Sequence, residues 1–308
     1  DIDTSAIADY VSGRRVLVTG AGGSIGSEIC RQLTKFEPSE LLMLDRDETG
    51  LHGTQLSLKG RALLEDRNLI LADPYFPRWW NARNYQTPAQ VWEDLRKMDA
   101  DFIHIPHQLA DTGNVPTDWD FADEEAQPVA EIFQIRGSYE YKGTPREAGR
   151  TIPGPGYFLQ DAWARGIVIG VIASPDHGGG YGKACVYAPE LSRRAILDAI
   201  RARRCYGTTA AKMFLDVRVD GHLMGEKVAE PAPENVEVKI RVRCPADVDR
   251  IDVCRNNQFI YTREGEGREA EVTFVDSDTL DGRSYYYVRV IQKDEEIGWT
   301  SPVWFGAK

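Results

Sequence analysis

Apolar residues in the first 73 positions form two alternating patterns, which are short continuous runs and the spacing of a helical face. Short apolar runs are typical of buried strands, and the segment from Ser24 to Phe36 places Ile25, Ile29 and Leu33 at the spacing of one helical face. Strands that alternate with helices of this length favour a parallel sheet. The pattern predicts a β-α-β-α-β order, with strands at 15–19, 41–44 and 69–71 and helices at 24–36 and 51–64.

The pattern changes after Asp73. The stretch DPYFPRWWNARNYQTP contains three prolines and shows no clear period, which is typical of a loop or a junction. An α/β alternation then resumes and continues to about residue 230. It predicts helices at 88–98, 156–165 and 192–203, and strands at 102–105, 129–135, 167–173 and 214–219.

Pro231 and Pro233 indicate a linker. Beyond it, apolar and polar residues alternate at 236–243, 250–253, 271–275 and 285–290, with turn residues between these segments. This alternation predicts an antiparallel β-sandwich. The chain is therefore expected to contain three domains, at 1–73, 74–230 and 231–308.

Composition narrows the class of partner. The net charge of -11 argues against a nucleic-acid interface, so a small-molecule ligand is expected. No membrane segment is expected in this chain, because no run reaches the roughly 18 apolar residues that a span requires. The five scattered cysteines favour a reducing, cytoplasmic location. The start at Asp1 is compatible with removal of an upstream membrane or secretory segment, and the oligomeric state stays open.

A glycine-rich turn lies between the first strand and the first helix. The segment VLVTGAGGSIGSEI carries Gly20, Gly23 and Gly26. Glycine permits a sharp strand-to-helix turn and lets a pyrophosphate approach the helix N-terminus. Asp45 ends the next strand, where a carboxylate accepts hydrogen bonds from an adenosine ribose. The alternative interpretation is a tight turn without a ligand.

The first 73 residues, including DIDTSAIADYVSGRRVLVTGAGGSIGSEICRQL, resemble the nucleotide-sugar 4,6-dehydratases of polysaccharide biosynthesis, which are extended short-chain dehydrogenase/reductases. The resemblance implies NAD or NADP contacts at Gly20, Gly23, Gly26 and Asp45, with Asp73 near the adenine. Because Arg46 follows Asp45, the resemblance is compatible with either NAD or NADP. The resemblance stops at Pro74, and the chain contains no Tyr-x-x-x-Lys pair, so it implies a nucleotide-binding half rather than a complete oxidoreductase.

A second set of polar residues follows the predicted strands of the middle region. His107, Glu131, Asp176 and His177 lie within or just after three of these strands. Hydrolytic metal sites of α/β barrels take their ligands from such strand ends, so the set predicts a divalent metal site. Each residue taken singly is more typical of a hydrogen-bonded loop or of a turn than of a metal ligand, and only the set as a whole makes the two interpretations comparable.

The segments IPHQLADTG, VAEIFQIRGSYE and GIVIGVIASPDHGGG resemble an uncharacterised family related to the polymerase-and-histidinol-phosphatase (PHP) metal-dependent hydrolases, over residues 77–308. The resemblance implies a distorted β/α barrel with bound Zn, Mn or Fe, and His107, Glu131, Asp176 and His177 match its ligand-bearing motifs. The His-x-His strand that begins such enzymes is missing from this chain, so the metal site is expected to be incomplete.

The expected fold class is α/β, with a partial Rossmann β-α-β unit joined to part of a PHP-like β/α barrel and followed by the β-sandwich. Three functions stay open. The principal prediction is a PHP-like metal-dependent hydrolase relative with an incomplete metal site, fused to the nucleotide-binding half. The alternatives are an NAD(P)-binding relative of the nucleotide-sugar 4,6-dehydratases and a non-catalytic chimera.

Overall fold

The chain divides into two compact units in the computed structural model. The first comprises Asp1–Leu63 and Asn81–Gln86, and the second comprises Leu64–Trp80 and Thr87–Lys308. The division thus falls near Leu64 rather than after Asp73, and the second unit spans the predicted linker at 231–233. The residues that the structure describes are 11–21, 23–36, 38–45, 67–73, 87–112, 116–151, 155–176, 181–278 and 282–307.

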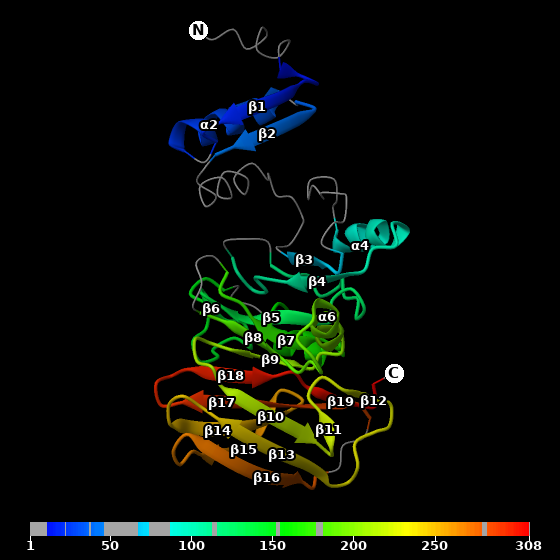
Figure 1. Ribbon diagram of the computed structural model, residues 1–308, viewed down its shortest axis with the longest axis vertical. Helices are drawn as coiled ribbons and strands as arrows, with labels where there is room; N and C mark the ends of the chain where they lie inside the picture. The colour runs from blue at the N-terminus through cyan, green and yellow to red at the C-terminus, as the bar shows by residue number, and fades with distance from the viewer. Residues whose placement is uncertain are drawn as a thin grey trace. The chain divides into compact units, whose positions relative to one another are not determined.

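The first unit contains a two-stranded parallel sheet with a helix packed on one face (Figure 1). Its small core is formed by Val18 from β1, Ala21 from the turn and Cys30 from α2, which are all buried. The predicted helix at 51–64 lies outside the described residues. The elements are β1 (Arg15–Thr19), α2 (Ser24–Leu33), the 3-10 helix η1 (Thr34–Phe36) and β2 (Glu40–Leu44).

The third predicted strand, β3 (Arg67–Leu71), belongs to the second unit. It pairs antiparallel with β4 (Phe102–Pro106), so that Ile70 lies opposite Ile103. Ile70 packs against a core cluster that includes Ile103 and Val129. In the described residues β3 is therefore a strand of the second unit's sheets and not the third strand of a parallel β-α-β-α-β sheet.

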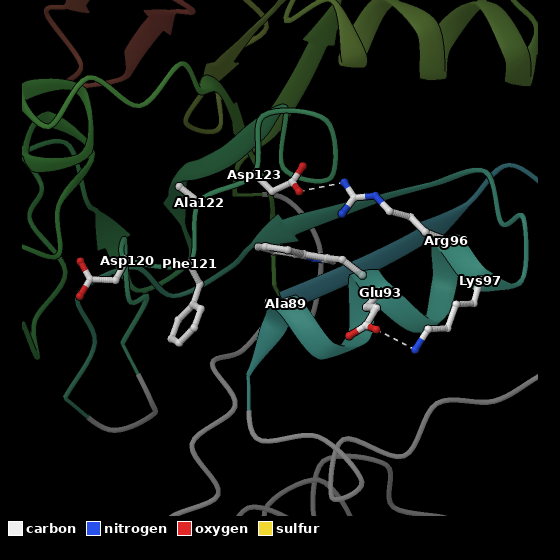
Figure 2. A pocket seen from close by; sticks show the side chains of 9 residues that line it. Ala89, Glu93, Arg96, Lys97, Asp120, Phe121, Ala122 and Asp123 are labelled. Carbon is white, nitrogen blue, oxygen red and sulfur yellow. Dashed lines mark hydrogen bonds and ion pairs between the residues drawn. The ribbon is translucent and has the colours of Figure 1, made fainter.

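Helix α4 (Pro88–Lys97) begins at the predicted residue, and the structure has Thr87 at its N-cap and Pro88 in its first turn. A hollow of about 580 Å³ lies between α4 and residues 120–123 (Figure 2). Arg96 contacts Asp123 at 2.8 Å and Lys97 contacts Glu93 at 2.7 Å. Because these rim charges are paired with one another, the hollow offers a ligand little unsatisfied charge.

A three-stranded sheet follows in the order β6-β5-β7, and β5 and β7 are parallel. Trp163 and Ile169 are buried beside this sheet, and the Trp163 indole donates a hydrogen bond to the Ile169 carbonyl at 2.8 Å. The elements of this region are β5 (Val129–Gln134), β6 (Gly137–Ser138), α5 (Leu159–Ala164), β7 (Gly170–Ala173), β8 (Lys183–Val186), α6 (Arg193–Arg201) and β9 (Cys205–Thr208).

The remaining strands form two sheets that share a core. One has the order β11-β10-β13-β16; the other follows β12-β19-β17-β18-β9-β8, with β14 and β15 off this path. Val238, Ile251 and Val288 are fully buried in the shared core. The strands are β10 (Phe214–Val219), β11 (His222–Leu223), β12 (Lys227–Val228), β13 (Val236–Arg243), β14 (Val248–Arg255), β15 (Gln258–Glu264), β16 (Glu269–Asp276), β17 (Ser284–Gln292), β18 (Ile297–Thr300) and β19 (Val303–Phe305).

Alternating apolar and polar residues correctly locate β13, β14, β16 and β17. The C-terminal sheets nevertheless include β8, β9 and β10, which precede Pro231 and Pro233. Strand β9 pairs antiparallel with β18, so that Gly207 lies opposite Trp299. The prolines therefore lie in a connection within one folded unit. No helix among the described residues has the length and hydropathy needed to cross a membrane.

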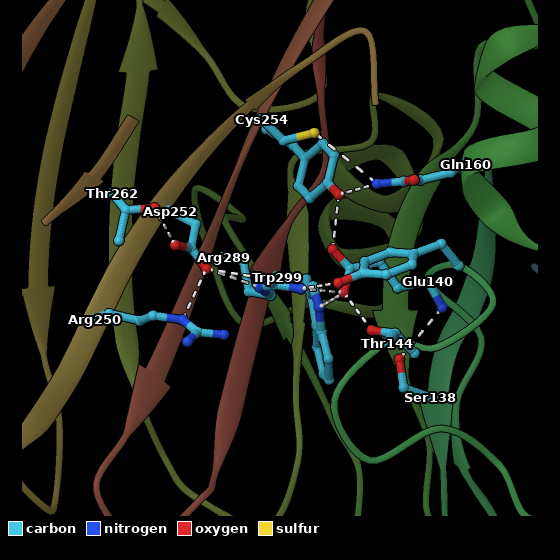
Figure 3. Close-up of polar contacts among 12 residues, drawn as sticks. Ser138, Glu140, Thr144, Gln160, Arg250, Asp252, Cys254, Thr262, Arg289 and Trp299 are labelled. Atoms are coloured by element: carbon cyan, nitrogen blue, oxygen red, sulfur yellow. Dashed lines mark hydrogen bonds and ion pairs between the residues drawn. The ribbon is translucent and has the colours of Figure 1, made fainter. Parts of the chain in front are cut away.

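A buried carboxylate joins the α/β region to the C-terminal strands (Figure 3). Glu140, fully buried after β6, accepts hydrogen bonds from the Tyr287 hydroxyl at 2.7 Å, the Trp299 indole at 2.9 Å and the Arg289 guanidinium at 3.0 Å. Arg289 also donates to Asp252 at 2.9 Å. The network therefore crosses the predicted linker, because Glu140 precedes it and Arg289 and Asp252 follow it.

We expect Glu140→Gln to lower the free energy of unfolding by about 3–5 kcal/mol, because the substitution leaves Arg289 buried with less compensating charge. Chemical denaturation of the second unit, followed by tryptophan fluorescence, measures this change. Glu125→Gln is the control, since Glu125 is 87% exposed and pairs with Arg96 at the surface. Its expected cost is under about 1 kcal/mol. Equal effects of the two substitutions would contradict a structural role for Glu140.

Candidate functional site

The glycine-rich turn connects the end of β1 to the start of α2. Gly20 has a φ of +68°, a left-handed conformation that favours glycine, and the Gly23 amide donates to the Gly20 carbonyl at 3.1 Å. Gly23 is the N-cap of α2, and the first turn of the helix contains no acidic side chain. The first amides of a helix lack intrahelical acceptors, so this end of α2 has the donors and the positive potential that bind an anion.

Gly26 sets the distance between the helix and the turn. A Cβ atom at this position would lie 1.9 Å from the Gly20 carbonyl oxygen and 2.9 Å from the Ala21 Cα. Both neighbours are backbone atoms, so a larger residue would displace α2 from the turn. A Cβ at Gly23 would lie 3.4 Å from the same carbonyl oxygen, which is ordinary van der Waals contact. Gly26 is therefore needed for packing, whereas Gly23 leaves open space beside the helix end.

Asp45 follows β2 at the same end of the sheet as the glycine-rich turn. Thr19 and Leu44 are opposite each other in the parallel register, so Gly20 and Asp45 are the next residues of two adjacent strands. The Ala21 amide also donates to the Leu44 carbonyl at 3.3 Å. The structure thus brings together four of the five predicted cofactor-binding residues. Asp73 follows β3 in the second unit, and its contact with adenine stays a prediction.

His107, Glu131 and Asp176 converge in the second unit. His107 follows β4, Glu131 lies in β5, and Asp176 follows β7. The His107 Nδ1 atom lies 2.5 Å from a Glu131 oxygen, and its Nε2 atom lies 3.2 Å from an Asp176 oxygen. The Asn68 amide donates to the second Glu131 oxygen at 2.8 Å. The imidazole therefore lies between two carboxylates.

Further charged groups extend this cluster. An Arg136 nitrogen lies 3.5 Å from Asp176 and 4.0 Å from Asp111, and the Tyr139 hydroxyl lies 3.5 Å from Asp111. Arg136 and Asn68 did not emerge from the sequence as members of the cluster. The sequence could have indicated Arg136 as a member of the cluster, because this residue follows the strand that carries Glu131. It could not have indicated Asn68, because the strand of Asn68 was assigned to a different sheet.

The geometry of this cluster differs from the predicted metal site. A histidine binds a metal through a ring-nitrogen lone pair, and the ligands must point at one common position. Here both ring nitrogens of His107 face carboxylates. Burial alone lowers the His107 pKa, but hydrogen bonds to Asp176 and Glu131 and their negative charges raise it to about 10, so both nitrogens carry protons. Burial also raises the Glu131 pKa.

No group of three or more His, Cys, Asp or Glu side chains with metal-binding geometry occurs among the described residues. His177, the fourth predicted ligand, lies outside them. His104, the other histidine of the β4 region, accepts a hydrogen bond from the Trp92 indole at 2.8 Å. Burial and the nearby Arg67 charge lower the His104 pKa to about 3, so this residue is a neutral core histidine.

Comparisons with known proteins found relatives named for polysaccharide biosynthesis and relatives without a described function. A family model described as polysaccharide biosynthesis protein matches residues 16–73. The probable polysaccharide biosynthesis protein EpsC of Bacillus subtilis is 52% identical over 60 residues, which are 20% of this chain and 10% of EpsC. The capsular polysaccharide biosynthesis protein CapD of Staphylococcus aureus is 41% identical over 58 residues, which are 19% of this chain and 10% of CapD.

An uncharacterised protein of Chlamydia trachomatis is 25% identical over 138 residues, which are 40% of this chain and 22% of that protein. The chain thus spans between 10% and 22% of the length of these three relatives. No solved structure matches the chain.

These matches correct the principal functional prediction. The family model and both named relatives belong to polysaccharide biosynthesis, which the dehydratase alternative had named. The prediction of a PHP-like metal-dependent hydrolase was wrong, and its metal cofactor finds no support in the His107 cluster. Residues 16–73 are similar to a polysaccharide-biosynthesis family.

The His107 cluster predicts a loss of stability at alkaline pH. Because the folded-state pKa is raised from 6.5 to about 10, the stabilisation by His107 is complete below pH 6.5 and declines as pH rises toward 10. The free energy of unfolding should fall with a slope of at most about 1.4 kcal/mol per pH unit. Denaturation of the wild type and of His107→Gln across pH 6 to 10 measures the difference. A constant difference between the two proteins would contradict the assignment of a protonated His107.

Proposed function

We propose that the first unit binds the adenosine diphosphate portion of NAD or NADP, as part of polysaccharide biosynthesis. One observation carries the proposal: the parallel register of β1 and β2 brings the Gly20–Gly26 turn and Asp45 to the same end of the sheet. A doubly wound fold binds nucleotides at the carboxyl ends of its parallel strands, where a helix N-terminus and a carboxylate lie together.

Each part of this arrangement matches one part of the ligand. The amides at the start of α2 would hold the pyrophosphate, and Gly23 lets its oxygens approach the backbone. The Asp45 carboxylate would accept hydrogen bonds from the adenosine ribose hydroxyls. The match of residues 16–73 to the polysaccharide-biosynthesis family supports this role independently of the geometry.

The proposed role is binding and not hydride transfer. The chain has no Tyr-x-x-x-Lys pair to supply the acid and base of short-chain dehydrogenase chemistry. The activities of the longer relatives therefore do not follow from this unit alone.

Gly23→Ala tests the proposed pyrophosphate contact. The methyl group fits beside the Gly20 carbonyl at 3.4 Å but occupies the space that the pyrophosphate needs. We expect saturable NAD or NADP binding by the wild type in calorimetric titration up to millimolar concentration, and a loss of at least about tenfold in affinity in the variant, or about 1.4 kcal/mol. The variant should keep its circular dichroism spectrum. In Gly26→Ala the added methyl group collides with backbone atoms, so this variant should lose both cofactor affinity and the wild-type circular dichroism spectrum. Wild-type affinity in Gly23→Ala would refute the proposal.

Asp45→Asn tests the ribose contact. A hydrogen bond to a charged group contributes about 1.5–3 kcal/mol, so NAD affinity should fall roughly tenfold to a hundredfold. NADP affinity should fall less, because the variant removes a negative charge near the 2′-phosphate. Glu40→Gln is the matched control, since Glu40 lies at the opposite end of β2 and pairs with Arg15. Equal losses of NAD affinity in Asp45→Asn and Glu40→Gln would show that the ribose does not contact Asp45.

A further inference from the structure

We draw no further inference here: the strongest candidate, the apolar face of the β1–β2 sheet on which Leu17, Leu42 and Leu44 are 59%, 40% and 57% exposed, carries none, because nothing in the structure shows what covers it.

Discussion

The hydrogen bonds and the ion pair of the buried Glu140 carboxylate are the interactions on which the second unit depends most. A charge removed from water is strongly destabilising unless hydrogen bonds and an opposite charge replace its hydration. Glu140 receives those partners from Arg289 and Trp299, which lie about 150 residues further along the chain. Arg289 in turn holds Asp252, and its guanidinium lies 4.2 Å from the centre of the Phe259 ring. Without the C-terminal strands, Glu140 would have neither compensating charge nor most of its donors.

The contacts of Glu140 with the C-terminal strands explain why the predicted linker at Pro231 and Pro233 does not separate two domains in the structure. Prolines in a polar stretch are typical of linkers, and Pro231 and Pro233 fit that description locally. Whether the segments on either side fold separately depends on long-range partners, such as Gly207 opposite Trp299. Local hydrophobic periodicity carries no information on such pairs. The same limit applies to β3: its apolar residues predict a strand, but nothing in five residues specifies β4 as its antiparallel partner.

For the His107 cluster, strand order predicts which residues meet but does not predict what chemistry they form. Placing polar residues at the ends of neighbouring strands was enough to predict that His107, Glu131 and Asp176 meet. It was not enough to predict their chemistry, which depends on a few ångströms and on the direction of two ring nitrogens. A metal needs lone pairs aimed at a shared centre, whereas here the imidazolium itself occupies the centre. Residue types and spacing are the same in both arrangements, so sequence alone does not choose between them.

The glycine-rich turn was more predictable because its determinants are local. The positive φ of Gly20, the N-cap at Gly23 and the close approach at Gly26 all arise within seven consecutive residues. Only the position of Asp45 requires a partner strand, and it is set by the parallel register of β1 and β2. The geometry at Gly20, Gly23 and Gly26 therefore depends mainly on neighbouring residues. This local geometry supports the proposed nucleotide-binding function, as does the match of residues 16–73 to a polysaccharide-biosynthesis family.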